Sequence, residues 1–259
     1  MLKIVLLGTG VPYPNINRHA TSQVILLDGR PIVVDCGRGA TLQLVRAGVD
    51  LGKIEELFFT HHHYDHNAGY ADLALTSWIM GRIGPLHVYG PRGTKRSSDL
   101  LFGENGIYDA DIRSRTEVQA GAAIYQDRGH GEFTRKGIEI DCHEISSPGI
   151  VLSQDNLVVR SCYANHMPEF MDSLAFRFES NGSLVISGDT TPFPQVIELA
   201  RRADLLIHDC NGTNDLLRKY KLDGIHTGAE DLGRIAAEAG VKKLVLTHTM
   251  LEVDTPSGL

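Results

Sequence analysis

Positively charged residues are in the minority in this sequence of 259 residues. The 25 Lys and Arg residues are outnumbered by 32 Asp and Glu residues, which gives a formal net charge of -7 and no polybasic segment. Nucleic acids and anionic membranes attract basic surfaces. Binding to RNA would therefore require a local basic patch that opposes the overall charge.

Cysteine is also scarce, and the scattered cysteines form no Cys-X-X-Cys pair: Cys36, Cys142, Cys162 and Cys210. Their spacing argues against a disulfide framework or a structural zinc knuckle, and favours small buried residues in a reducing compartment. The sequence also lacks an apolar run long enough to span a bilayer, and the apolar segment 1–7 is too short for a secretion signal. We therefore expect a cytoplasmic protein that makes no use of a membrane.

Hydrophobic residues make up 42% of the chain, enough to bury a full core as one domain spanning residues 1–259 or as two closely packed halves. Apolar runs and alternation predict strands at 4–7, 22–27, 31–34, 57–59, 86–89, 138–140, 150–152, 157–162, 173–179, 184–186, 204–208 and 244–246. Helical periodicity predicts helices at 41–47, 70–82, 193–202 and 227–239. The pattern after residue 137 indicates antiparallel pairing. Strands followed by helices in each half suggest two sheets packed face to face with helices outside, a four-layer α/β arrangement.

A run of histidines follows the apolar strand predicted at 57–59. Side chains two positions apart in an extended segment point the same way, so His61 and His63 can converge on one ion. Asp65 and His66 are neighbours and cannot both face that ion easily. A second ion beside the first resolves this difficulty, because two-metal hydrolytic sites hold their ions about 3.5–4 Å apart. We expect the segment Asn67-Ala68-Gly69 to open a helix that helps to hold Asp65 and His66.

A histidine run can also be a surface feature without function. The internal position of this run, directly after a hydrophobic strand and with an Asp at a suitable offset, favours a metal site. His62 is out of phase with its neighbours. We therefore predict that His62 faces solvent or supports a ligand, and does not itself bind metal.

Three further polar residues also lie just past predicted hydrophobic strands: His166, Asp189 and His248. Strand ends lie on one rim of a sheet, where separate strands can aim side chains at a common point. Imidazoles and carboxylates without a thiolate suit zinc. We predict that one zinc ion is held by His61, His63 and His166, that a second is held by Asp65, His66 and His248, and that Asp189 is shared.

The roles of two further features, Asp35 and the segment 94–126, each have more than one interpretation. Asp35 ends the strand at 31–34, where it either orients a histidine ligand or serves as a turn residue. The polar segment 94–126 has a weak helical pattern. Several basic residues lie in it or just before it: Arg92, Lys95, Arg96, Arg113 and Arg115. That segment either steers an anion or closes over the site as a lid, or its charges belong to a solvated helical face.

Together these motifs resemble the metallo-β-lactamase superfamily and, within it, the ribonuclease Z-like hydrolases, a group that includes related arylsulfatases. The resemblance covers nearly the whole chain and rests on Leu7-Gly8-Thr9-Gly10, Asp35-Cys36-Gly37, the HxHxDH motif from His61 to His66, His166, Gly188-Asp189-Thr190 and Leu246-Thr247-His248. It implies one metallo-β-lactamase-like domain with an αββα sandwich and a dinuclear zinc site. Manganese and iron stay open as alternative metals.

The resemblance implies a zinc-dependent ester hydrolase in which a water bridging two metals is activated to attack a phosphodiester or related ester. Asp65 would hold one zinc and orient or deprotonate the nucleophile. His226-Thr227 resembles the His-Ser/Thr element of the ribonuclease Z branch, in which the His assists phosphate-oxygen chemistry. The catalytic candidates are therefore Asp65 and His226. The other interpretation of His226 is a helix N-terminal residue beside a capping Thr.

The chain departs from tRNA-processing members of that branch. His166 and Asp189 are separated by only one predicted strand and a turn, which leaves no room for the basic flexible arm that grips tRNA. The segment 68–72 lacks the family's Gly-Leu-Pro-Gly, and Arg38 replaces an acidic residue. With the acidic net charge, these differences disfavour tRNA and favour a small-molecule ester or a short nucleotide.

Other functions within the superfamily are weighed against this one. Arylsulfatase- or lactonase-type hydrolysis of a small ester is the main alternative. Di-iron redox members typically carry a Glu where His63 stands and need a flavin partner domain, and non-catalytic relatives usually lack several ligands. All seven predicted ligands are present here, so we expect neither of these two classes. Relatives often form dimers, which leaves a homodimer open.

Overall fold

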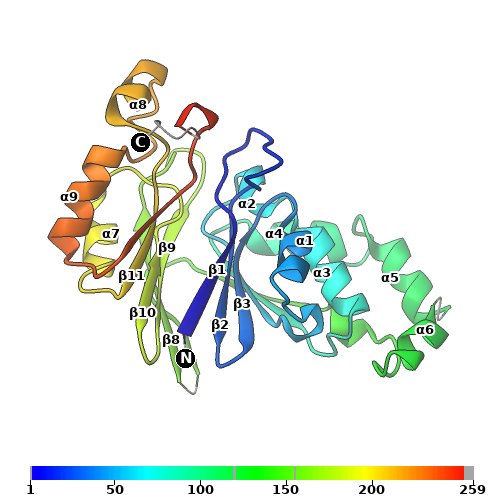
Figure 1. Ribbon diagram of the computed structural model, residues 1–259. Coiled ribbons are helices and arrows are strands. Elements are labelled where there is room, and N and C mark those ends of the chain that lie inside the picture. The colour runs from blue at the N-terminus through cyan, green and yellow to red at the C-terminus, as the bar shows by residue number, and fades with distance from the viewer. Residues whose placement is uncertain (1, 119–120, 155, 254–259) are drawn as a thin grey trace.

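Two six-stranded sheets pack face to face at the centre of the molecule, and helices cover their outer sides (Figure 1). The structure is a computed structural model that describes residues 2–118, 121–154 and 156–253. The layers are helix, sheet, sheet and helix, so the predicted four-layer arrangement is confirmed. None of the helices in the described ranges is long and apolar enough to cross a membrane.

The first sheet has the order β1-β2-β3-β4-β5-β6. Its strands are β1 (Leu2–Gly8), β2 (Ser22–Leu27), β3 (Arg30–Cys36), β4 (Glu56–Phe58), β5 (Leu86–Gly90) and β6 (Ile140–Glu144). The first three strands pair antiparallel, and β3 to β6 pair parallel. The turn between β2 and β3 has Asp28 at φ 51° and Gly29 at φ 90°, backbone angles that suit the tight hairpin indicated by the sequence.

The second sheet has the order β12-β11-β10-β9-β8-β7. Its strands are β7 (Gly149–Gln154), β8 (Leu157–Ala164), β9 (Ser173–Glu179), β10 (Ser183–Ile186), β11 (Leu205–Asp209) and β12 (Leu244–Thr247). Strands β7 to β10 pair antiparallel, as predicted, but β10, β11 and β12 are parallel. The expectation of antiparallel pairing throughout is wrong here, because helices carry the chain back between these strands.

The predicted strand 138–140 is mostly wrong. Residues Arg135–Ile138 form the short 3-10 helix η2, and β6 starts at Ile140. That strand joins the edge of the first sheet, parallel to β5, and does not pair within the second sheet. The short apolar alternation at 138–140 gave no information about which sheet would accept the strand.

Helices on the first half of the chain are α1 (Ala40–Arg46), η1 (Leu51–Lys53), α2 (Tyr64–Asn67), α3 (Tyr70–Ile79), α4 (Thr94–Phe102), α5 (Asp109–Thr116) and α6 (Ala122–Asp127). The second half has α7 (Pro194–Leu199), α8 (Asn214–Tyr220), α9 (Ala229–Ala239) and η3 (Leu251–Val253). Helices α7 and α9 cover the outer face of the second sheet (Figure 1). The sequence analysis did not predict α8, whose mixed sequence shows no clear apolar face.

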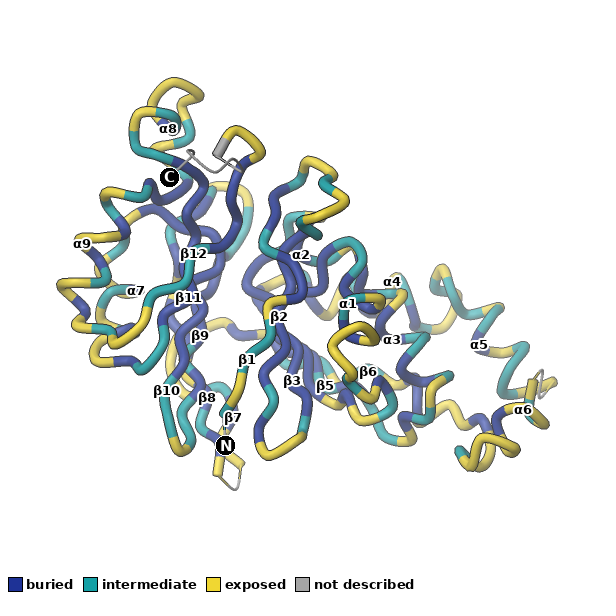
Figure 2. Tube along the Cα trace, in the orientation of Figure 1, coloured by how far each residue is buried: buried dark blue, intermediate teal, exposed yellow. Residues whose placement is uncertain are grey.

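The two sheets bury a common apolar layer between them (Figure 2). At its centre the Phe58 ring lies 4.6 Å from the Tyr89 ring and 5.3 Å from the Phe178 ring. Alternate residues of the first sheet, such as Leu57 and Val88, instead pack under the outer helices. Because both faces of these strands are buried, their sequences are apolar runs without a polar side.

None of the described residues between 94 and 126 lines the cavity that opens over the predicted ligands, so this part of the chain does not form a lid. Figure 1 shows α5 and α6 projecting from the outer side of the first sheet, away from α2. Several basic side chains of the segment are paired with acids one helical turn away, as in Lys95–Asp99 and Arg113–Glu117. These pairs support the interpretation as a solvated helical face, because i,i+4 pairs form on helix surfaces in water.

The inter-sheet layer predicts a stability test. The Phe178→Ala substitution removes a fully buried ring that packs against Phe58. We expect the free energy of unfolding to fall by about 3–5 kcal/mol, from lost burial and the cavity left behind. Denaturant unfolding followed by circular dichroism measures this. The control Leu42→Ala, on a side chain that is 66% exposed, should change it by less than about 0.5 kcal/mol; equal effects would contradict the described packing.

Candidate metal centre

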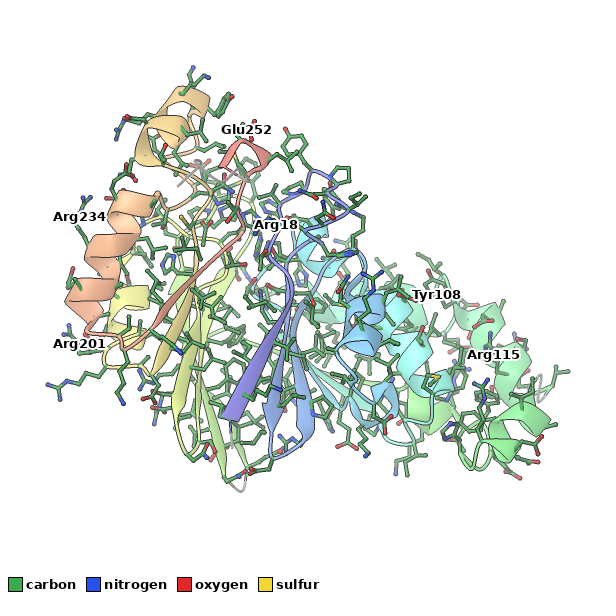
Figure 3. The ribbon with its side chains drawn as sticks, in the orientation of Figure 1. Arg18, Tyr108, Arg115, Arg201, Arg234 and Glu252 are labelled. Atoms are coloured by element: carbon green, nitrogen blue, oxygen red, sulfur yellow. The ribbon has the colours of Figure 1, made fainter. Side chains whose placement is uncertain are left out.

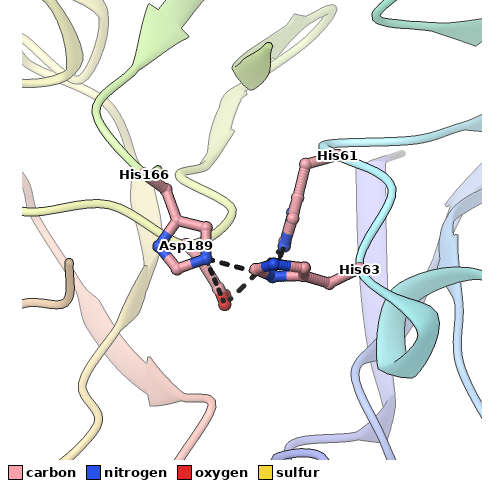
Figure 4. A group of neighbouring side chains, drawn as sticks. All are labelled: His61, His63, His166 and Asp189. Carbon is pink, nitrogen blue, oxygen red and sulfur yellow. Dashed lines mark hydrogen bonds and ion pairs between the residues drawn. The ribbon is translucent and has the colours of Figure 1, made fainter. Parts of the chain in front are cut away.

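The residues predicted to bind metal follow strands of both sheets that end at a shared rim. His61 comes three residues after the end of β4, and His166 comes two residues after the end of β8. Asp189 and His248 follow β10 and β12 in the same way. Side chains delivered from separate strands therefore meet over the junction of the two sheets, as Figure 4 shows for His61, His63, His166 and Asp189.

The histidine-rich segment changes conformation in its middle. His63 is extended, with φ -65° and ψ 144°, and the helix α2 then begins at Tyr64. Asp65 and His66 thus lie inside this short helix, so the expectation of a helix opening at Asn67 is wrong. The link between α2 and α3 is packed tightly against the end of β3, because the Gly69 N–H donates to the Cys36 carbonyl at 2.8 Å and a Cβ at Gly69 would meet backbone at 2.7 Å.

Three imidazoles form the first group. The Nδ1 atom of His63 lies 3.1 Å from Nε2 of His61 and 3.1 Å from Nε2 of His166. The Asp189 carboxylate is 3.8 Å from each of those two Nε2 atoms. Zinc bonds of about 2.0–2.1 Å in tetrahedral geometry separate ligand atoms by about 3.4 Å. These separations therefore suit one divalent cation among the four side chains.

The second group contains Asp65, His66 and His248. The Nε2 atom of His248 lies 3.3 Å from the Asp65 carboxylate and 3.2 Å from the Asp189 carboxylate. The Nε2 atom of His66 is 3.5 Å from the other Asp189 oxygen. That nitrogen is buried and has no hydrogen-bond partner among the described residues. A buried nitrogen without a hydrogen-bond partner that faces two carboxylates fits a site in which a cation is bound among these side chains.

The electrostatics of the two groups also fit cations. Burial lowers the pKa of His61 well below its usual value, and the neighbouring His66 lowers it further. A neutral His61 offers a lone pair. Burial opposes the charge on Asp189, but His248 and His66 hold its pKa well below the usual value. Burial opposes the charge on His66, but Asp189 and Asp35 raise its pKa well above the usual value. His66 must therefore release a proton to bind a metal ion, because a ligating imidazole is neutral.

Two hydrogen bonds hold imidazoles in orientation. The Nδ1–H of His66 donates to Asp35 at 2.8 Å, and the same carboxylate accepts from the N–H and hydroxyl of Thr60 at 2.8 Å each. Asp35 is fully buried, so it orients a histidine, which is one of its two predicted roles. The Nδ1–H of His166 donates to the Ile225 carbonyl at 2.7 Å. In both rings Nε2 is left to face the cluster.

Asp209 is a site residue that the sequence analysis missed. Its fully buried carboxylate lies 2.9 Å from Nδ1 of His226 and accepts the N–H of Thr190 at 3.2 Å. Burial opposes the charge on His226, but Asp209 outweighs it and raises the pKa of His226 to about 9. Asp209 ends β11, so the rule that selected His166 and Asp189 would have found it.

Other contacts settle two further expectations. The Nε2 atom of His62 lies 2.9 Å from the Thr94 hydroxyl, outside both groups. Helix α9 starts at Ala229, and the Thr227 hydroxyl donates to the Thr190 carbonyl at 2.7 Å. Interpreting His226 as a helix N-terminal residue beside a capping Thr is therefore wrong. The amide of Asn211, also missed, lies 3.0 Å from Nδ1 of His248.

A cavity of about 420 Å³ opens over the two groups. His226, Asp65 and four of the other clustered residues form its floor. Its walls are largely apolar and are formed by Val11, Pro12, Tyr13, Met167, Tyr220, Leu222, Ile225 and Met250. No Lys or Arg of the described chain lines the cavity, and Glu252, which is labelled in Figure 3, is its only charged wall residue. The volume lies in the range of small-molecule sites, about 300–1,000 Å³.

Comparisons with known proteins agree with this geometry. Residues 30–249 match the family described as the beta-lactamase superfamily domain. Ribonuclease Z of Methanosarcina acetivorans is 30% identical, over 96% of this chain and 87% of that protein. Ribonuclease Z of Mycobacterium marinum is 31% identical, over 96% and 86%. The crystal structure of the short form of human tRNase Z superposes with a TM-score of 0.71 at 22% identity, covering 96% of this chain and 93% of that one.

The contacts of Asp35 predict a loss of metal affinity on substitution. Asp35→Asn places an amide NH2 against either the His66 N–H or the Thr60 donors, which disturbs the His66 orientation. We expect zinc affinity to fall about 10–100-fold. Competition against a chromophoric chelator measures the affinity, with circular dichroism to verify folding. Asp127→Asn, on the exposed end of α6, is the matched control; a folded Asp35→Asn protein with unchanged affinity would refute the role of Asp35.

Proposed function

Because the chain belongs to the β-lactamase superfamily and, within it, to the ribonuclease Z-like hydrolases, we propose that it is a dinuclear zinc enzyme that cleaves phosphodiester bonds. One observation carries the proposal. The ligand atoms of His61, His63, His166 and Asp189 all lie within 4.8 Å of one another, and so do those of Asp65, His66 and His248. Both groups lie at a cavity of substrate size.

The proposed ligands divide by their distances. His61, His63 and His166 hold one ion, and Asp65, His66 and His248 hold the other. Asp189 is shared, because one of its oxygens lies 3.2 Å from His248 of the second group and 3.8 Å from His61 of the first group. Its other oxygen lies 3.5 Å from His66. When bound, two divalent ions supply Lewis acidity that activates water and offsets negative charge on the substrate.

The protein side chains then orient the reactants and move protons. Asp65 lines the cavity floor, where its carboxylate orients the attacking water and accepts its proton. His226 also lines the cavity, and Asp209 holds its Nδ1. The remaining nitrogen, Nε2, is free to donate a proton to the leaving-group oxygen or to stabilise charge on a phosphate oxygen.

The cavity walls suit a small substrate. A long polyanion such as tRNA gains affinity from Lys and Arg contacts to phosphates. The described cavity lining has none, and between His166 and Asp189 the chain forms only the β9–β10 hairpin, without a basic arm. We therefore favour a phosphodiester with small or apolar substituents, including a short nucleotide. Tyr13 and Tyr220 offer aromatic surface to such a group.

Cleavage of a phosphodiester in RNA is the second candidate. It is favoured by the ribonuclease Z relatives, which match 96% of this chain at 30–31% identity. Sulfate esters and lactones are further substrates that the same site could accept, because the ions would polarise those bonds too. A substrate panel of small diesters, sulfate esters, lactones and tRNA precursors separates these activities.

Bis-p-nitrophenyl phosphate tests the hydrolase directly. We expect the zinc-loaded protein to release p-nitrophenol, and Asp65→Ala to lower kcat by about 10²–10⁴-fold, since it removes a ligand and a base. Release is followed by absorbance, with metal content measured in parallel. Asp72→Ala, on an exposed position of α3, is the control. Inactivity of the zinc-loaded wild type across the whole panel would refute the proposed function.

The proton-donor role of His226 predicts a dependence on the leaving group. His226→Ala and Asp209→Asn should each lower kcat strongly for a diester with an alkyl leaving group, which needs protonation. The loss should be smaller for p-nitrophenolate, which departs readily without a proton. Zinc content should be unchanged in both variants, and the ratio of kcat for the two substrates is the readout. A uniform loss on both substrates would assign the pair a structural role only.

A further inference from the structure

A second cluster of metal-ligand side chains lies on the first sheet, outside the cavity. It consists of His87 on β5 and of Asp141 and His143 on β6, and none of the three lines the cavity described above. The proposed phosphodiesterase makes no use of these residues. Like the groups of the candidate metal centre, however, this cluster combines imidazoles with a carboxylate.

The strand register brings the three side chains together. His87 pairs with Asp141 and Tyr89 pairs with His143 in the parallel ladder of β5 and β6. Positions 87 and 89 point to the same face of the sheet, as do 141 and 143. Tyr89 belongs to the inter-sheet core, so this is the face that looks toward the second sheet. Strand β6 is at the sheet edge, where that face becomes polar.

The distances suit a cation. Nδ1 of His87 lies 2.9 Å from one Asp141 oxygen, and Nε2 of His143 lies 3.1 Å from the same oxygen. All three ligand atoms lie within 4.8 Å of one another. Tetrahedral zinc separates its ligand atoms by about 3.4 Å. Only small side-chain movements are therefore needed to admit an ion, and an imidazole pair with one carboxylate is a donor set suited to zinc.

The core holds one ligand in place in advance. The His143 ring stacks on the Tyr89 ring, with centroids 4.5 Å apart and planes 11° apart. Tyr89 is buried and stacks in turn on Phe58 at 4.6 Å. This stack of three rings fixes the plane of His143, so less side-chain entropy is lost when the ring binds an ion.

Solvent can reach the cluster, and the surrounding charge does not oppose a cation. The side chains of His87, Asp141 and His143 are 35%, 49% and 41% exposed, which leaves room for water as a further ligand. Glu56, paired with His87 across the β4–β5 ladder, adds a carboxylate on the same face. Its charge is balanced by Arg30 at 3.0 Å.

We propose that His87, Asp141 and His143 form an accessory zinc site that joins the edge strand β6 to β5. The ion links the two strands through side chains, in addition to their backbone ladder. Because an ion that binds the folded state stabilises it, zinc at this site lowers local opening of β6. The site is independent of the proposed catalytic ions.

Counting zinc tests the proposal. Wild type and His143→Phe are dialysed to equilibrium against the same micromolar free zinc, and bound metal per chain is measured by elemental analysis. Phenylalanine keeps the ring that stacks on Tyr89 and removes the ligand nitrogen. We expect His143→Phe and Asp141→Asn to bind one zinc ion fewer than wild type. His130→Ala, a histidine outside both clusters, should bind the wild-type number.

Hydrogen exchange supplies a readout that does not depend on stoichiometry. Zinc should slow backbone exchange at residues 140–144 in wild type and not in His143→Phe. Identical zinc counts in wild type and both variants, with no zinc effect on exchange in β6, would mean that the three side chains form only a hydrogen-bonded group, and would overturn the proposal. The difference of one ion between wild type and variant is meaningful whether or not the cavity ions bind, so this outcome is separate from failure of the proposed phosphodiesterase.

Discussion

The carboxylate of Asp189, almost completely buried between two groups of imidazoles, is the constraint that organises this protein's functional rim. A buried carboxylate is costly unless positive charge or hydrogen bonds compensate it. Here the neighbours are nitrogen atoms of His61, His66, His166 and His248, at 3.2 to 3.8 Å. This arrangement of one carboxylate among four imidazoles, with Asp65 nearby, fits a site that is completed by two cations. The chemistry proposed for the rim depends on it.

The sheet topology makes that rim available. Parallel strands end on the same side of a sheet. The polar residues that follow them therefore lie at one rim, just beyond the apolar layer. The inter-sheet layer around Phe58 and Phe178 fixes the two sheets against each other, and thereby fixes the distance between His63 and His166, which are 103 residues apart in sequence. Hydrogen bonds from Asp35 and the Ile225 carbonyl then set the ring orientations. Apolar packing thus sets the ligand positions, and polar contacts behind the ligands set their directions.

The cavity lining bears on the proposed substrate. Membership in the ribonuclease Z-like hydrolases accounts for the clustered His and Asp residues, whereas the apolar walls and the lack of Lys or Arg in the described lining favour a small diester. In the proposed enzyme, chemistry and substrate choice therefore reside in different elements. The strand ends carry the former, and the segments bearing Tyr13, Met167 and Tyr220 carry the latter. At the edge of the first sheet, His87, Asp141 and His143 show that the same residue types also gather where the cavity has no part.

The sequence by itself determined the layer architecture and the seven candidate ligands, because apolar runs and the residues directly after them are local signals. It could not determine that β6 joins the first sheet parallel to β5, since strand partners depend on nonlocal packing. Nor could it show that Asp209 holds His226, that Asp35 holds His66, or that α5 and α6 project away from α2. Those facts depend on distances between segments far apart in the chain, and only the packing of the two sheets decides them.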